Sequence, residues 1–132
     1  MKIELVPASK ILSIMIVCLG VIHELATFTP LVQDGLECLS RSDFNSVIYM
    51  SLMCGASLVL SGWLLLLLLP KNVTHTFLAY PILLISIFVL INGIVSVVFM
   101  VDNPFAWFVL VSGLLITIIS ACNYILFTPN DK

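Results

Sequence analysis

The sequence predicts an all-α protein, an integral membrane antiparallel four-helix bundle whose N- and C-termini are both cytoplasmic. Three observations carry the prediction: the composition, the length of the charge-free runs, and the distribution of lysine and arginine between the loops. Of the 132 residues, 61% are apolar and 9% are charged, and the mean hydropathy is +1.24. Soluble domains carry about 25% charged residues, so an ordinary soluble globule is excluded. A disordered chain and a nucleic-acid-binding protein are excluded for the same reason.

Three charge-free runs supply three of the helices. Residues 44–70, 72–101 and 103–130 contain no Asp, Glu, Lys or Arg. A span needs about 20 residues, and a charge at the bilayer centre costs about 3 kcal/mol. Each run therefore holds one span, and we expect helices at about 46–69, 76–100 and 104–127. The runs are continuously apolar, whereas the strands of a membrane β-barrel alternate.

The first helix is expected at about 11–29. Its first half is too apolar to leave in water, and Pro30 ends it, although His23 and Glu24 interrupt the apolar run. Residues 30–44 then form an outer loop, in which Asp34 and Gly35 make a turn and residues 36–39 a short interfacial helix. This loop could act as a lid. The whole chain, residues 1–132, is expected to be a single transmembrane domain.

The basic residues of the loops predict the orientation. Lys2, Lys10, Lys71 and Lys132 fall on one side of the predicted bundle, whereas the other side has Arg41 alone. Short loops rich in lysine and arginine stay in the cytoplasm. The protein is therefore expected to cross the cell (inner) membrane several times with both termini inside.

Small and hydroxyl residues recur at helical spacing in every predicted helix. Such stripes mark the faces along which membrane helices pack. They are Ser13, Gly20, Glu24 and Thr27 in the first helix, Ser51, Gly55, Leu58, Ser61 and Gly62 in the second, Ser86, Asn92, Gly93 and Ser96 in the third, and Gly113, Thr117, Ser120 and Tyr124 in the fourth.

His23 and Glu24 are the one feature that packing does not explain. Ionisable residues within a span usually face the protein interior and mark a functional site. For a helix that begins at Ile11, a rise of about 1.5 Å per residue puts them in the outer half of the membrane. We therefore predict a polar ligand- or proton-binding pocket, open to the outer side and lined by five residues: His23, Glu24, Thr27, Asn92 and Ser96. If the helix begins near Val6 instead, the pair becomes a solvated helix end.

No metal, cofactor or catalytic residue is predicted. His23-Glu24 begins like the helical zinc-protease motif, but the second histidine at i+4 is absent. The other histidine, His75, belongs to the loop on the opposite side. The cysteines Cys18, Cys38, Cys54 and Cys122 form no CxxC motif.

A family resemblance rests on the first two helices. The segment from Leu19 to His23 is followed by Ala26-Thr27, and the second span contains Gly55 and Ser61-Gly62. This pattern resembles small four-helix bacterial membrane proteins of the DoxX-like kind. The resemblance implies the four-helix fold and a bacterial inner membrane, and it implies no activity.

Three functions follow from the His23-Glu24 pair and the polar stripes. The first is binding or helping to move a small amphiphile, a lipid or a proton-coupled solute, with Glu24 able to hold a cation. The second is an accessory or structural subunit that packs against another membrane protein or as a homodimer. The third is a lipid- or quinone-modifying enzyme with His23 and Glu24 as acid and base. We expect the first, because no nucleophile or cofactor motif accompanies the pair. The expected partners are membrane lipid and a small amphiphilic ligand, without nucleic acid.

Overall fold

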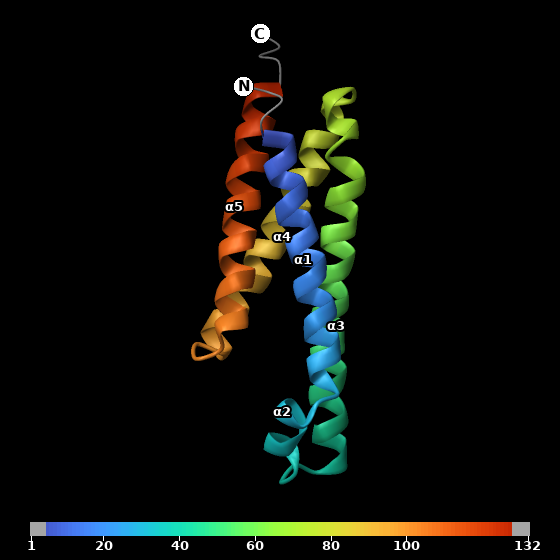
Figure 1. Ribbon diagram of the computed structural model, residues 1–132, viewed down its shortest axis with the longest axis vertical. Coiled ribbons are helices and arrows are strands. Elements are labelled where there is room, and N and C mark those ends of the chain that lie inside the picture. The colour runs from blue at the N-terminus through green and yellow to red at the C-terminus, as the bar shows by residue number, and fades with distance from the viewer. Residues whose placement is uncertain (1–4, 128–132) are drawn as a thin grey trace.

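A computed structural model describes residues 5–127, and its backbone is built from four long helices (Figure 1). They are α1 (Leu5–Thr27), α3 (Arg41–Leu68), α4 (Ala79–Phe99) and α5 (Pro104–Phe127). The connections hold one short helix, α2 (Pro30–Gln33), and three 3₁₀ turns, η1 (Asp34–Leu36), η2 (Lys71–Val73) and η3 (Thr76–Leu78). The described part of the chain has no strand, which confirms the predicted all-α class and the number of long helices.

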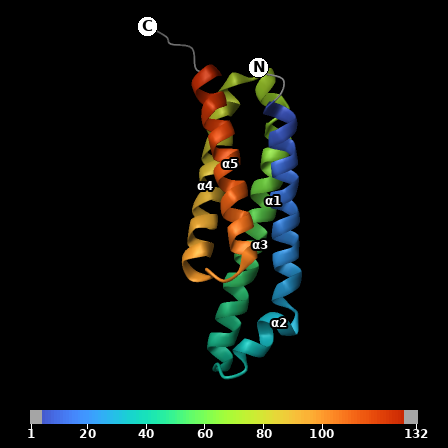
Figure 2. The ribbon, with the colours of Figure 1, turned by 60° about the vertical axis from the view of Figure 1, so that its left-hand side comes forward.

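The long helices form two antiparallel pairs. α1 packs along α3, and α4 packs along α5, while smaller contacts of α1 with α5 and of α3 with α4 join the pairs. α1 begins and α5 ends at the same end of the bundle, as Figures 1 and 2 show. We call the opposite end, which holds α2, η1 and the α4–α5 connection, the distal end. There the α4–α5 pair stops first, so that the end of α1 and the start of α3 project beyond it (Figure 2).

Buried residues recur at alternating intervals of three and four along each long helix. This spacing of about 3.5 residues is typical of helices that pack at a shallow crossing angle. The buried positions that follow this spacing are Ser9, Ser13, Ile16, Gly20 and Thr27 in α1, Gly55, Leu58, Gly62 and Leu65 in α3, Ala79, Ile82, Ser86, Val89 and Gly93 in α4, and Ala106, Val109, Gly113, Ile116 and Ser120 in α5. The predicted small-residue stripes are therefore confirmed as packing faces in all four helices.

Glycines let the backbones of each pair touch. A Cβ atom on Gly20 would lie 2.8 Å from the backbone nitrogen of Val59. In the other pair, a Cβ on Gly93 would lie 2.5 Å from the Cα of Leu110, and one on Gly113 would lie 2.9 Å from the Cα of Leu90. Without a hydrophobic drive between helices in lipid, such close packing is what holds membrane helices together.

The outer surface of the bundle is covered by large apolar side chains. Leu25, Leu60, Phe99 and Ile125 are each more than half exposed, and many similar residues surround them. All four long helices are long and apolar enough to cross a membrane. A surface of this kind suits contact with lipid and not with water. The fold is therefore a bundle of four candidate membrane-spanning helices.

The last helix, α5, has the predicted ends, residues 104 and 127, whereas several other helix ends differ from the predicted ones. α1 begins at Leu5 instead of residue 11 and ends at Thr27 instead of 29, and α3 begins at Arg41 instead of 46. The prediction placed helix ends where charges end an apolar run, but a helix continues past the lipid boundary wherever its backbone hydrogen bonds continue. The short loop helix also lies earlier than predicted, because Pro30 starts α2 instead of only ending α1.

Candidate functional site

His23 and Thr27 lie in the last two turns of α1 and meet Ser51 of α3. The Ser51 hydroxyl is 3.1 Å from Nε2 of His23 and 2.7 Å from Oγ1 of Thr27. Thr27 also donates to the backbone carbonyl of His23 at 2.9 Å. Thr27 is 1% exposed, whereas His23 and Ser51 are half-buried. These three side chains form a compact polar cluster at the distal end of the α1–α3 interface.

Glu24 packs against the backbone of Gly55 beside this cluster. A Cβ atom at position 55 would lie 2.5 Å from Oε1 of Glu24 and 2.9 Å from its Cδ. Oε1 is buried and accepts no hydrogen bond, and Glu24 forms no ion pair with any residue that the structure describes. The side chain as a whole is half-buried, so the packing shields one carboxyl oxygen, Oε1.

The segment after α1 also contacts the cluster. The side-chain amide of Gln33, in α2, donates to the backbone carbonyl of Thr27 at 3.4 Å. That carbonyl belongs to the last turn of α1 and has no acceptor role within its own helix. α2 is thereby tied to the end of α1, next to the cluster. The lid function of this loop stays a prediction.

The other two predicted site residues lie in the second helix pair. Asn92, on α4, donates to the backbone carbonyl of Phe88 in its own helix at 3.2 Å. Ser96 lies one turn further along α4. Because α4 packs mainly on α5, the structure groups His23, Glu24 and Thr27 with Ser51 and Gly55, and it places Asn92 and Ser96 in the other pair.

The sequence held a signal for the α3 partners. Ser51 and Gly55 both belong to the predicted stripe of the second helix, and helices that follow one another in the chain usually pack together. That rule pairs the His23 turn with the start of α3. The prediction chose the partners of His23 by their depth in the membrane. Depth alone does not distinguish Ser51 on the second long helix from Asn92 on the third.

The cluster lies near the edge of the apolar part of α3. At about 1.5 Å per residue, a hydrocarbon core of about 30 Å takes about 20 residues. Counting back that far from Leu69, which precedes Pro70 and Lys71, reaches about Met50. Ser51 is thus at the boundary, and Gly55 lies about one turn inside. This level falls between the two sequence-based alternatives, a pocket in the outer half and a solvated helix end.

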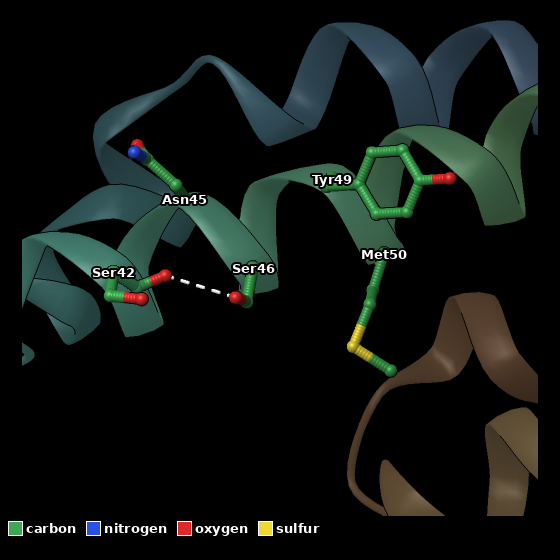
Figure 3. A pocket seen from close by; sticks show the side chains of 5 residues that line it. All are labelled: Ser42, Asn45, Ser46, Tyr49 and Met50. Atoms are coloured by element: carbon green, nitrogen blue, oxygen red, sulfur yellow. Dashed lines mark hydrogen bonds between the residues drawn. The ribbon is translucent and has the colours of Figure 1, made fainter.

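Two surface hollows lie elsewhere. The first is open and lies on the first turns of α3, lined by Ser42, Asn45, Ser46, Tyr49 and Met50 (Figure 3). The second is a shallow apolar groove between α3 and α4, lined by Ser57, Leu60, Ser61, Leu64, Leu84, Ile85 and Phe88. Neither His23 nor Glu24 lines these two hollows.

Within residues 5–127, no three His, Cys, Asp or Glu side chains gather closely enough to hold a metal ion. The four cysteines are free thiols. The one other buried side-chain oxygen without a hydrogen bond in this part of the chain is Oδ1 of Asn72, in the α3–α4 connection. No protein-family model, curated protein or solved structure matches the chain.

Proposed function

We propose that this protein is a multi-pass protein of the bacterial inner membrane that takes up a proton at Glu24 and His23 and uses it in binding or moving a proton-coupled solute. Both termini lie in the cytoplasm, so that the distal end faces outward. The observation that carries the proposal is Oε1 of Glu24, which is buried against Gly55 and accepts no hydrogen bond.

The close packing around Glu24 favours a proton over a larger ligand. The space at Gly55 is too small for an added methyl group, because a Cβ there would approach Oε1 to 2.5 Å. The ammonium group of an amphiphile is larger than a methyl group and does not fit between Oε1 and Gly55. A metal ion would need further ligands, and within residues 5–127 no three His, Cys, Asp or Glu side chains gather to supply them. A proton needs no such room.

His23 supplies a second group that can exchange a proton in the same turn. It lies next to Glu24, four residues before the end of α1. Histidine is also the side chain whose charge changes most readily near neutral pH. An adjacent acid and base at the lipid boundary, on the outward end, can accept protons from the outer aqueous phase.

Infrared difference spectroscopy tests this proposal on the full chain in lipid bilayers. Spectra recorded between acid and alkaline pH report the carbonyl band of a protonated carboxylic acid. We expect the wild-type spectrum to contain one such band that Glu24→Gln removes. Glu37→Gln is the matched control, since Glu37 is exposed in the distal segment after η1, and it should leave that band in place.

The alternative outcome is equally clear. If the spectrum of the Glu24→Gln protein superimposes on that of the wild type, Glu24 exchanges no proton in this pH range, and the proposed function fails. If Glu37→Gln removes the same band, the band belongs to the exposed carboxyl, and the proposal fails as well.

A further inference from the structure

The hydroxyl protons of the cluster can be assigned from its contacts. A backbone carbonyl only accepts, so the contact of Thr27 Oγ1 with the carbonyl of His23 at 2.9 Å commits the single hydroxyl proton of Thr27. Thr27 Oγ1 must then accept in its 2.7 Å contact with Ser51. The hydroxyl proton of Ser51 is committed in turn, because it is donated to Thr27.

The assignment extends to the imidazole of His23. With its proton given to Thr27, the Ser51 oxygen can only accept in its 3.1 Å contact with Nε2 of His23. Nε2 must therefore carry a hydrogen. The donors form a closed circuit that runs from Nε2–H of His23 through Ser51 and Thr27 back to the carbonyl of His23. In a neutral imidazole only one nitrogen is protonated, so Nδ1 is then the bare acceptor.

We infer that Ser51 is a positioning residue that holds neutral His23 as the Nε2–H tautomer and so makes Nδ1 the atom that takes up the proton. This inference rests on the proposed function and names the atom at which His23 serves it. Protonation at Nδ1 leaves these hydrogen bonds as they are. Protonation at Nε2 would start from a ring whose Nε2 is bare, and the hydroxyl groups of Ser51 and Thr27 would then have to turn and change their acceptors.

The surroundings of the ring agree with this role for Nδ1. Nδ1 is not one of the buried atoms without a hydrogen bond, and no described residue bonds to it, so it is open to its surroundings. The ionisable neighbours are Glu24 on the same helix and Cys54 of α3, which lies close enough to Glu24 to interact with it electrostatically. The residue of α2 that reaches this turn is the uncharged Gln33.

Nitrogen NMR of the full-length, ¹⁵N-histidine-labelled protein in lipid tests the inference. His75→Gln removes the only other histidine signal. The pH is raised until the histidine signals stop changing, so that the spectra report the neutral imidazole. We expect a protonated Nε2 and an unprotonated Nδ1. Ser51→Ala should replace this single form by a mixture of tautomers, Ser51→Thr should restore it, and Ser46→Ala, on the same helix, should not alter it.

Three outcomes decide the inference. A wild-type His23 protonated at Nδ1 overturns it without any variant, so that misfolding of Ser51→Ala does not matter. A tautomer unchanged in folded Ser51→Ala overturns the role of Ser51. The expected pattern supports the inference even where the infrared band of Glu24 is absent, and in that case only the proposed function fails.

Discussion

Gly55 shows how one missing side chain creates the environment of Glu24. The absence of a Cβ atom lets the carboxyl group lie directly on the backbone of α3, with Oε1 shielded from solvent. A stripe of small residues predicts close packing in general. Here the same feature determines where an ionisable group can go, because the notch at Gly55 is filled by Glu24 and not by the backbone of α1.

Gly55→Ala should displace the carboxyl group of Glu24 from the notch, because the atoms that an added Cβ would meet belong to the flexible end of that side chain. The displacement costs little, and alanine favours a helix by about 1 kcal/mol over glycine. We therefore expect loss of the Glu24 infrared band, while the free energy of unfolding in mixed micelles stays close to the wild-type value. Gly35→Ala is the control, because a Cβ there meets nothing within 4 Å, and it should leave the band in place. An unchanged band in Gly55→Ala would contradict the packing described for Gly55.

At the scale of helices, the sequence predicts packing faces better than it predicts ends. The stripes through Gly20, Gly62 and Gly93 follow from residue size and helical period alone, and all three residues are buried. Helix ends depend on capping and on contacts beyond the apolar run, which hydropathy does not report. The first helix shows this. Lys10 precedes the apolar run but belongs to α1, where its side chain is exposed while Ser9 and Ser13 on either side of it are buried.

The start of α3 was nevertheless readable from a capping motif. Ser40, Arg41, Ser42 and Asp43 form a Ser-x-x-Asp sequence, a variant of the capping box. In the structure, the Ser40 hydroxyl accepts from the backbone N–H of Asp43 at 3.2 Å and donates to the carboxylate of Asp43 at 2.7 Å. This local signal starts the helix outside the apolar run, which allows α3 to project past the α4–α5 connection.

Ser40→Ala should remove this cap and weaken the first turn of α3 by about 1 kcal/mol. The loss should be local, because the first turns of α3 are exposed and are not covered by the second pair. Hydrogen exchange at the amides of residues 42–44 should therefore become faster by several-fold. Ser46→Ala is the control, since its hydroxyl donates to the carbonyl of Ser42 within the same helix. The same acceleration in both variants would show that Ser40 is not the cap.

At the scale of the whole molecule, the pairing of helices explains which part of the site the sequence could predict. His23, Glu24 and Thr27 share one stripe of a single helix, so their grouping follows from the helical period. The partner across the interface depends on which helices pack together, and that is a property of the assembled bundle. α1 pairs with α3, and so Ser51 and Gly55 complete the cluster in place of Asn92 and Ser96.

The same arrangement makes the orientation of the bundle testable with thiols. The distal segment carries Cys38, which is exposed, whereas Thr74 is exposed in the α3–α4 connection at the opposite end. With Lys71 beside Thr74, the positive-inside rule predicts that this connection faces the cytoplasm. A membrane-impermeant maleimide added to intact cells should therefore label Cys38, and Cys38→Ser should abolish the labelling. In the Cys38→Ser background, Thr74→Cys should react only after the cells are opened. Labelling of Thr74→Cys from outside, with Cys38 protected in the wild type, would invert the bundle and place His23 and Glu24 on the cytoplasmic side, away from the outer source of protons.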